Sequence, residues 1–210
     1  GGLCLVLTAL RMASDEFAVD PDRIHVAGRG KGVSAAVAAG NYSPQRFAGV
    51  IGRAGDMVEG ATPENFGNLP TLFVGAGANA RSFQEAATAA GFKNCELSSG
   101  GKEQDVWNWV QRQQRTTYPA SVTLDVGNPF PTRAYWLRVA PTASDASATA
   151  TIDRATNTIR INSQSVSFAT IYLNDGLVDL SKPVIVRCNG VESTSRFERA
   201  LSTTLDLLSS

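Results

Sequence analysis

The residues best spaced for chemistry form a glycine-rich turn. Gly28-Arg29-Gly30-Lys31-Gly32 follows the short apolar stretch 24–27 and precedes a run of small residues over 33–39. A strand that ends in G-x-S-x-G before a helix lifts a nucleophilic serine above a parallel sheet. The central position here is Gly30, which has no side chain. The turn therefore has the spacing for nucleophilic catalysis but lacks the nucleophile.

The same turn could bind an anion instead. A helix N-terminus offers free N–H groups and the positive end of a dipole, and a glycine lets a ligand approach the backbone. Basic residues from several segments would gather there: Arg29, Lys31, Lys102, Arg53 after the second strand and Arg81 after the third. The ligand would be a carboxylate, a phosphate or an acidic peptide. The alternative is that Gly30 marks an unused site and that the cations are solvated.

Nucleotide-binding motifs fit this turn poorly. A dinucleotide fingerprint can start only at Gly30, with Ala35 as its last residue. The acidic residue expected about 20 positions later is missing, because Arg53 follows the second strand. A phosphate loop needs Ser or Thr after its lysine, and Lys31 is followed by Gly32. The sequence therefore predicts no nucleotide cofactor.

The elements around the turn alternate between helix and strand up to about residue 115. Apolar spacing predicts helices over 3–16, 33–40, 81–90 and 103–114, and strands over 23–27, 47–51, 72–74 and 94–97. Continuous apolar strands between helices predict a parallel sheet covered on both faces.

These segments resemble, in chain order, the later half of an α/β-hydrolase of the prolyl-oligopeptidase or dienelactone-hydrolase type. Residues 17–24 look like the entry to the nucleophile strand, and residues 28–32 like the nucleophile turn. Residues 46–51 look like the next strand of the family. Residues 69–75 look like the strand that presents the catalytic acid, and residues 98–103 like the loop that bears the catalytic histidine. The resemblance implies a partial α/β-hydrolase sheet with flanking helices in residues 1–117.

The catalytic groups that this family uses are absent. A hydrolase triad needs a nucleophile, an imidazole and a carboxylate. Gly30 stands at the serine position and Lys102 at the histidine position, and no Asp or Glu occurs from 71 to 84. The acid region instead holds Gly77, Ala78 and Asn79. We therefore predict a catalytically inactive protein with a binding, scaffold or assembly role.

Two other functions remain open. The first is an esterase or peptidase with a non-standard nucleophile such as Ser34 or Ser43, although neither has a matched base. The second is a ligand sensor that binds anions at Arg29, Gly30, Lys31, Arg53 and Lys102. His25 is the only histidine. We expect its ring to pack within the strand before the turn rather than to transfer protons.

The resemblance also implies that part of the sheet is missing. The family has several strands before the helix with which this sequence starts, and a truncated sheet would expose an apolar edge. We therefore expect a second polypeptide, the other product of a cleaved precursor, or an oligomeric partner to supply the missing strands. Gly1 is not a start methionine, which fits a processed chain or an excerpt.

Residues 118–210 change to a two-residue alternation typical of β-strands. Strands are predicted over 122–126, 135–140, 148–152, 158–162, 166–173 and 184–188, with a last helix over 201–208. We predict a small antiparallel β-sandwich. This half is similar to the β-domain that follows the hydrolase domain in some bacterial proteins, which favours a secreted or periplasmic bacterial protein.

Two groups of residues in this half have the right types for ligand binding. Aromatic residues could line a carbohydrate face, although alternating aromatics more often form a core: Tyr135, Trp136, Phe168 and Tyr172. Asn174, Asp175 and Asp179 could form a calcium loop, but their spacing is irregular. A polar hairpin turn explains these three residues better.

Composition excludes several other classes of protein. Of 210 residues 43% are hydrophobic and 18% charged, which is typical of a globular chain. Nineteen basic residues balance nineteen acidic ones, so no overall field favours nucleic acid. No stretch is long enough for a membrane span. The three cysteines are far apart, which predicts no metal site, and Cys4 and Cys95 are expected to be small buried residues.

Overall fold

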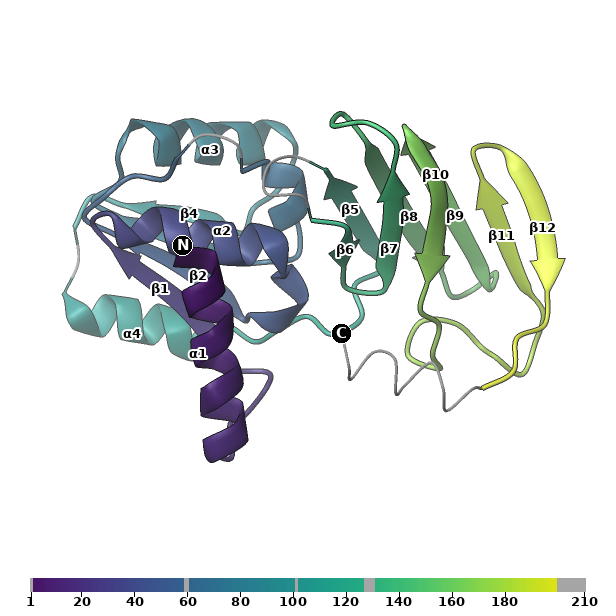
Figure 1. The fold of residues 1–210 in the computed structure, drawn as a ribbon, viewed down its shortest axis with the longest axis horizontal. Coiled ribbons are helices and arrows are strands. Elements are labelled where there is room, and N and C mark those ends of the chain that lie inside the picture. Colours follow the sequence, from purple (N-terminus) through teal and green to yellow (C-terminus); the bar gives the residue numbers. More distant parts are fainter. Residues whose placement is uncertain (1, 59–60, 101, 127–130, 200–210) are drawn as a thin grey trace.

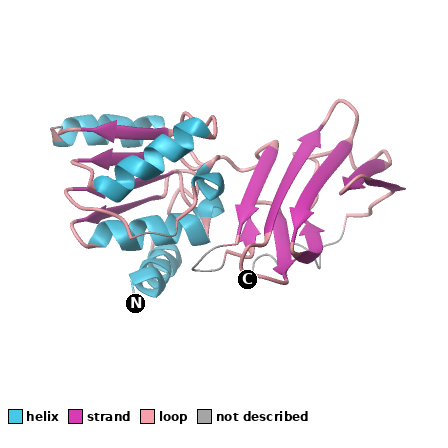
Figure 2. Ribbon diagram, turned by 90° about the horizontal axis from the view of Figure 1, so that it is seen from above, coloured by secondary structure: helices cyan, strands magenta, loops and turns pink. Residues whose placement is uncertain are grey.

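The chain folds into an α/β part followed by a β part, as its two periodicities predict (Figure 1). The structure is a computed structural model, and it describes residues 2–58, 61–100, 102–126 and 131–199. The two parts lie side by side when the molecule is turned by 90° (Figure 2). The predicted C-terminal helix over 201–208 falls outside the described residues.

The α/β part is built on a four-stranded parallel sheet in the order β1-β2-β3-β4. Its strands are β1 (His25–Arg29), β2 (Gly49–Arg53), β3 (Thr71–Val74) and β4 (Cys95–Ser98). Its helices are α1 (Gly2–Glu16), α2 (Gly32–Tyr42), α3 (Ala78–Ala89) and α4 (Glu103–Arg112), with 3-10 turns η1 (Pro44–Arg46) and η2 (Pro63–Phe66). The predicted parallel sheet with helices is confirmed.

Helices cover both faces of this sheet, as predicted (Figure 1). On one face Val26, Val50 and Phe73 pack in a cluster with α2 and α3, and α1 adds partly buried leucines to it. On the other face the ring of Trp109 from α4 packs against β2 and β3. Continuous apolar strands are what such two-sided burial requires.

The β part contains two sheets with a shared core. The larger sheet has the order β12-β11-β9-β8-β5 and the smaller one β10-β7-β6. Buried residues of both sheets, such as Leu124 and Leu137, belong to one cluster, as in a sandwich. The strands are β5 (Ser121–Asp125), β6 (Arg133–Ala134), β7 (Leu137–Pro141), β8 (Ser147–Asp153), β9 (Thr158–Gln164), β10 (Val166–Ile171), β11 (Val184–Cys188) and β12 (Val191–Ser195).

The β part departs from the predicted antiparallel sandwich in three places. Strand β11 runs parallel to β9, because the chain crosses to the smaller sheet as β10 before it returns. The predicted strand over 135–140 starts only at Leu137, since Tyr135 and Trp136 form the turn between β6 and β7. A strand that was not predicted, β12, follows Asn189 and Gly190, whose φ angles of 47° and 85° fit a two-residue hairpin turn.

A buried asparagine joins the two parts. Asn65 in η2 is 3% exposed and donates to the Oδ1 of Asn41 and to the backbone oxygen of Asp125, both at 2.9 Å. Its own Oδ1 accepts the Asp125 N–H at 2.7 Å. Because these bonds are short and buried, they hold β5 against the α/β part.

The cysteines differ in part from expectation. Cys4 is exposed on α1, so the prediction that it is buried was wrong, and Cys95 is only partly buried. All three cysteines are free thiols. Among the helices that the structure describes, none has the length and apolar character to cross a membrane.

Candidate functional site

The glycine-rich turn, residues 28–32, has the strand–turn–helix geometry that its spacing predicts. Strand β1 ends at Arg29, Gly30 has a φ of +55°, and α2 begins at Gly32. The Gly30 N–H donates to the Arg53 oxygen at 2.9 Å, which fixes the turn to the end of β2. A Cβ on Gly28 would lie 2.1 Å from the Gly32 oxygen, so only glycine fits at that position.

The apex of the turn is open. A Cβ built on Gly30 would meet nothing within 4 Å, whereas a Cβ on Gly55 would lie 2.3 Å from the Gly30 oxygen. The turn is thus packed against the backbone on one side and free on the side where a nucleophile would project. With glycine at the apex, the arrangement offers no side chain for covalent catalysis.

The predicted acid region contains a carboxylate after all, but one supplied by another strand. Asp56, which follows β2, accepts the backbone N–H groups of Met57, Asn79 and Ala80 at 2.9–3.0 Å. Burial would raise the pKa of Asp56, but these backbone hydrogen bonds outweigh it and lower the pKa. The carboxylate is therefore engaged in capping α3 and is not paired with an imidazole.

Sequence reasoning missed Asp56 and its consequence for α3. The helix begins at Ala78 rather than at the predicted residue 81, because the Asp56 carboxylate satisfies the N–H groups of its first turn. Gly77, Ala78 and Asn79 therefore form the capped start of a helix. The signal in the sequence was an aspartate in the loop that follows the predicted strand 47–51, since the loops after parallel strands carry functional groups.

The histidine position of the resemblance is the N-cap of α4. The Lys102 N–H donates to the Asp105 carboxylate at 3.0 Å, while the Lys102 side chain is exposed. An exposed ammonium cannot take the part of a neutral imidazole base. The triad positions therefore hold a glycine, a helix start and a lysine.

The cations predicted around the turn do not all remain available. The Arg53 guanidinium contacts both oxygens of Glu103 at 2.7 Å, and Arg81 donates to the Ala76 oxygen at 2.8 and 3.2 Å. The side chains of Arg29, Lys31 and Lys102 are exposed. An anion site at the turn stays a prediction, with Arg53 already paired to a carboxylate.

His25 packs within the α/β part as expected. Its Nδ1 lies 2.9 Å from the Arg23 oxygen, and its ring makes an edge contact with Trp109 at 6.3 Å between centroids. Burial lowers its pKa, and the nearby Arg23 charge acts in the same direction, against the hydrogen bond to the Arg23 carbonyl. This surrounding of backbone and indole suits a neutral structural imidazole.

Acidification below pH 6.5 should destabilise the chain through His25. Its pKa in the folded state lies below the unfolded value of about 6.5, so the unfolded state binds the extra proton first. Stability present above pH 6.5 is then lost as the pH falls toward the folded-state pKa. Urea denaturation from pH 7.5 to 5 should show this slope in the natural chain.

His25→Phe keeps an aromatic ring and removes the titration. The variant should flatten the pH slope, because no other histidine occurs in the chain. An equal slope in both proteins would contradict the assignment.

The aromatic residues of the β part do not form one binding face. Tyr135 and Trp136 are buried, and the Trp136 indole donates to the Pro119 oxygen at 2.8 Å. They belong to the core, as expected. Phe168 is 64% exposed, so the same expectation was wrong for this residue, and the Tyr172 ring lies 5.1 Å below the Arg133 guanidinium.

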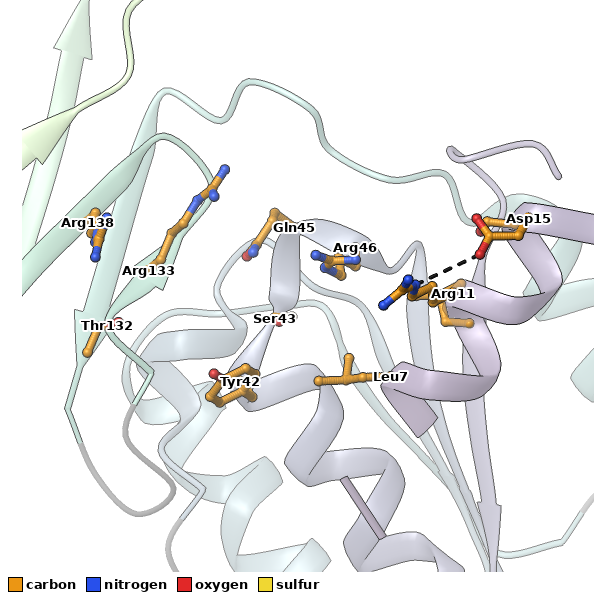
Figure 3. Close-up of a pocket in the computed structure, with 12 residues that line it drawn as sticks. Leu7, Arg11, Asp15, Tyr42, Ser43, Gln45, Arg46, Thr132, Arg133 and Arg138 are labelled. Carbon is orange, nitrogen blue, oxygen red and sulfur yellow. Dashed lines mark ion pairs between the residues drawn. The ribbon is translucent and has the colours of Figure 1, made fainter. Parts of the chain in front are cut away.

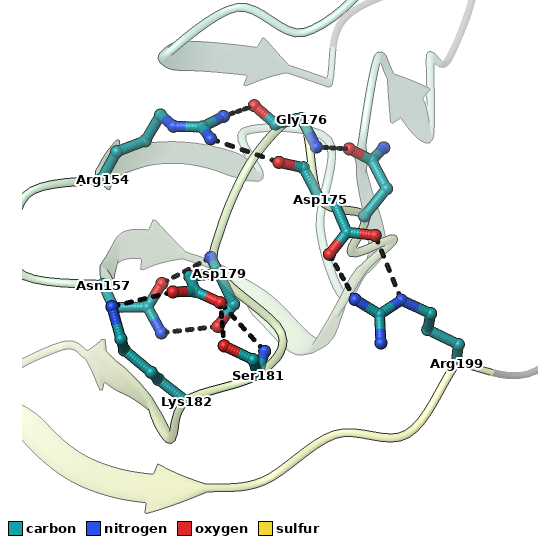
Figure 4. Close-up of polar contacts among 9 residues, drawn as sticks. Arg154, Asn157, Asp175, Gly176, Asp179, Ser181, Lys182 and Arg199 are labelled. Carbon is teal, nitrogen blue, oxygen red and sulfur yellow. Dashed lines mark hydrogen bonds and ion pairs between the residues drawn. The ribbon is translucent and has the colours of Figure 1, made fainter.

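The acidic turn of the β part is a structural network (Figure 4). Asp175 pairs with Arg199 at 2.7 Å, and Asp179 accepts from the Ser181 hydroxyl at 2.5 Å and the Lys182 ammonium at 2.9 Å. The Ser181 and Lys182 donors lower the pKa of Asp179 to about 2. Within the described residues no group of three or more His, Cys, Asp or Glu side chains is placed to hold a metal ion. The turn is therefore built from polar contacts, but it is not the hairpin turn that was predicted, because it connects β10 and β11, which lie in different sheets.

No protein-family model matches this chain, and none of the curated proteins matches it either.

Proposed function

We propose that this chain is a non-catalytic binding unit on an α/β-hydrolase-like framework, completed by a strand from another polypeptide or from another segment of a longer precursor. The observation that carries the proposal is the open β1 edge of the parallel sheet. Among the described strands β1 pairs only with β2, so its other side is unpaired. Unprotected edges bind further strands.

Helix α1 supports the same function. Leu3, Val6 and Leu10 of α1 pack on the cluster that contains Val26 of β1, but α1 has no fully buried residue. Leu5 and Met12 are 72% and 63% exposed. Large apolar side chains that a helix leaves exposed to water form a surface that a partner could cover.

The loss of catalytic groups supports a binding role rather than hydrolysis. Gly30 has no side chain, Asp56 caps a helix and Lys102 is an exposed N-cap. The main rival is a hydrolase with a non-standard nucleophile. Ser34 is the nearest serine in α2, and its hydroxyl lies 3.4 Å from the Asp56 backbone oxygen, which is not a base.

Self-association of the isolated chain tests the proposal. We expect light scattering after gel filtration to give a mass above 22.2 kDa, because the β1 edge and α1 are uncovered. Leu5→Lys with Met12→Lys should return the mass to that of the monomer. Val58→Lys changes a residue that is 64% exposed outside α1 and should leave association unchanged.

Two outcomes would contradict the proposal. A stable natural chain that runs as a monomer and does not bind a hydrophobic dye would remove the need for a completing segment. Labelling by a fluorophosphonate probe, with turnover of p-nitrophenyl esters, would favour the hydrolase instead.

A further inference from the structure

A groove of about 870 Å³ lies between the α/β part and the β part (Figure 3). Its walls come from α1, the end of α2, η1 and the β6–β7 hairpin. Volumes of this order are typical of sites for small molecules. The hydrogen bonds of Asn65 hold the two parts together, so the groove has a defined shape.

Arginine dominates the lining of this groove. Arg133 and Arg138 project from the β part, while Arg46 and Arg11 lie on the side of the α/β part (Figure 3). Among the described residues, the one carboxylate in the lining is Asp15, which pairs with Arg11 at 3.8 Å. In the part of the chain that the structure describes, no carboxylate pairs with Arg46 or Arg138.

The hairpin places two of these arginines next to each other. Arg133 and Arg138 are direct cross-strand partners in the β6–β7 hairpin. Like charges in such positions destabilise a sheet. Burial lowers the pKa of Arg133, and the charges of Arg46 and Arg138 act in the same direction, against the effect of Tyr172. An anion in the groove would be attracted to Arg46 and Arg138, which have no carboxylate partner among the described residues.

From these observations we propose that the groove binds a small molecule that carries a phosphate or carboxylate oxyanion. Guanidinium groups match the two oxygens of such groups in geometry and charge. The Gln45 Oε1 in the lining is buried without a described hydrogen-bond donor, and a ligand hydroxyl would satisfy it. Leu7, Leu10 and Tyr42 form an apolar wall for the rest of the ligand.

The groove suits an anion better than the glycine-rich turn does. At the turn, Arg53 is already paired with Glu103 and Arg81 donates to the Ala76 oxygen, whereas in the described residues no carboxylate pairs with Arg46 or Arg138 of the groove. In the groove, arginines from α1, η1 and the hairpin line one hollow from both parts of the chain.

Calorimetric titration of the whole chain with inorganic phosphate, citrate and phenyl phosphate tests the site. We expect saturable one-to-one binding of at least one probe, weakened about tenfold or more in Arg46→Gln/Arg138→Gln, since hydrogen bonds to charged groups are lost. The control Arg112→Gln/Arg160→Gln removes two exposed arginines outside the groove and should bind as the natural chain does. Phenyl phosphate should bind more tightly than phosphate if the apolar wall takes part.

Thermal unfolding provides a second readout that does not depend on affinity alone. Without anion, Arg138→Gln should unfold at the same or a higher temperature, because it removes a repulsive pair. The ligand should raise the midpoint of the natural chain and leave that of the double variant unchanged.

Three results would overturn the proposal. They are no saturable binding of any of the three probes, an equal loss of binding in the control variant, and a loss only in Arg29→Gln/Lys31→Gln, which would place the anion at the turn. Saturation by a polyglutamate peptide alone would indicate a protein-binding surface instead of a small-molecule site.

Discussion

Gly28→Ala should destabilise the chain by about 3 kcal/mol or more, at the upper end of overpacking effects. The new methyl carbon would lie 2.1 Å from the Gly32 oxygen, 2.4 Å from its carbonyl carbon and 2.7 Å from the Val33 nitrogen. All three are backbone atoms, which cannot rotate away as a side chain can. The start of α2 would have to separate from β1. Urea denaturation followed by circular dichroism measures this loss.

Gly32→Ala is the matched control, because it adds the same methyl group on the other side of the same turn. Its Cβ would meet nothing within 4 Å, and alanine favours a helix over glycine by about 1 kcal/mol or less. We therefore expect a neutral or slightly stabilised variant. Equal destabilisation by both substitutions would show that the turn does not pack as described.

The order of helices and strands in the α/β part could be predicted because it depends on local periodicity. The strand bounds were less accurate. The second strand was predicted over 47–51, whereas β2 extends to Arg53. Strand β2 continues to Arg53 because its backbone pairs with the end of β1, where the Gly30 N–H donates to the Arg53 oxygen, and this long-range pairing leaves no local trace in the sequence.

The β6–β7 turn could not be predicted from the turn preferences of its residues. The first position of such a two-residue turn usually holds glycine when φ is positive, but Tyr135 occupies it with a φ of 51°. Burial of its ring at 7% exposure against the sandwich core offsets the backbone strain. Tertiary packing therefore decides a conformation that the local sequence opposes.

The glycine-rich turn could be predicted from sequence because its residues are consecutive. The arginine-lined groove could not, since Arg46 and Arg138 line one groove only when the two parts dock. The partners of Asp56 were hidden for the same reason, because the N–H groups of Asn79 and Ala80 are 23 and 24 residues away in the chain. Contiguous motifs are readable in one sequence, whereas sites assembled by tertiary contacts need the structure.

Trp109→Ala should cost about 3–5 kcal/mol, the usual range for removing a buried large aromatic side chain. The Trp109 side chain is 2% exposed and packs against Ile51, Leu72 and Val74. It is the main contact between α4 and the sheet. A Cβ on Gly49 would lie 2.7 Å from its ring, so β2 uses glycine where the indole needs space. The Trp109 N–H also donates to the Glu96 carboxylate at 2.9 Å, and that bond would be lost.

Trp107→Ala provides the control on the same helix. Its side chain is 56% exposed, so the substitution should change the free energy of unfolding by about 1 kcal/mol or less. Both variants remove an indole from α4, and helix propensity therefore changes equally. A large difference in urea midpoint would assign the stability to the buried contact beneath the sheet. Similar midpoints would mean that α4 does not cover this face, and the two-sided α/β architecture would then fail.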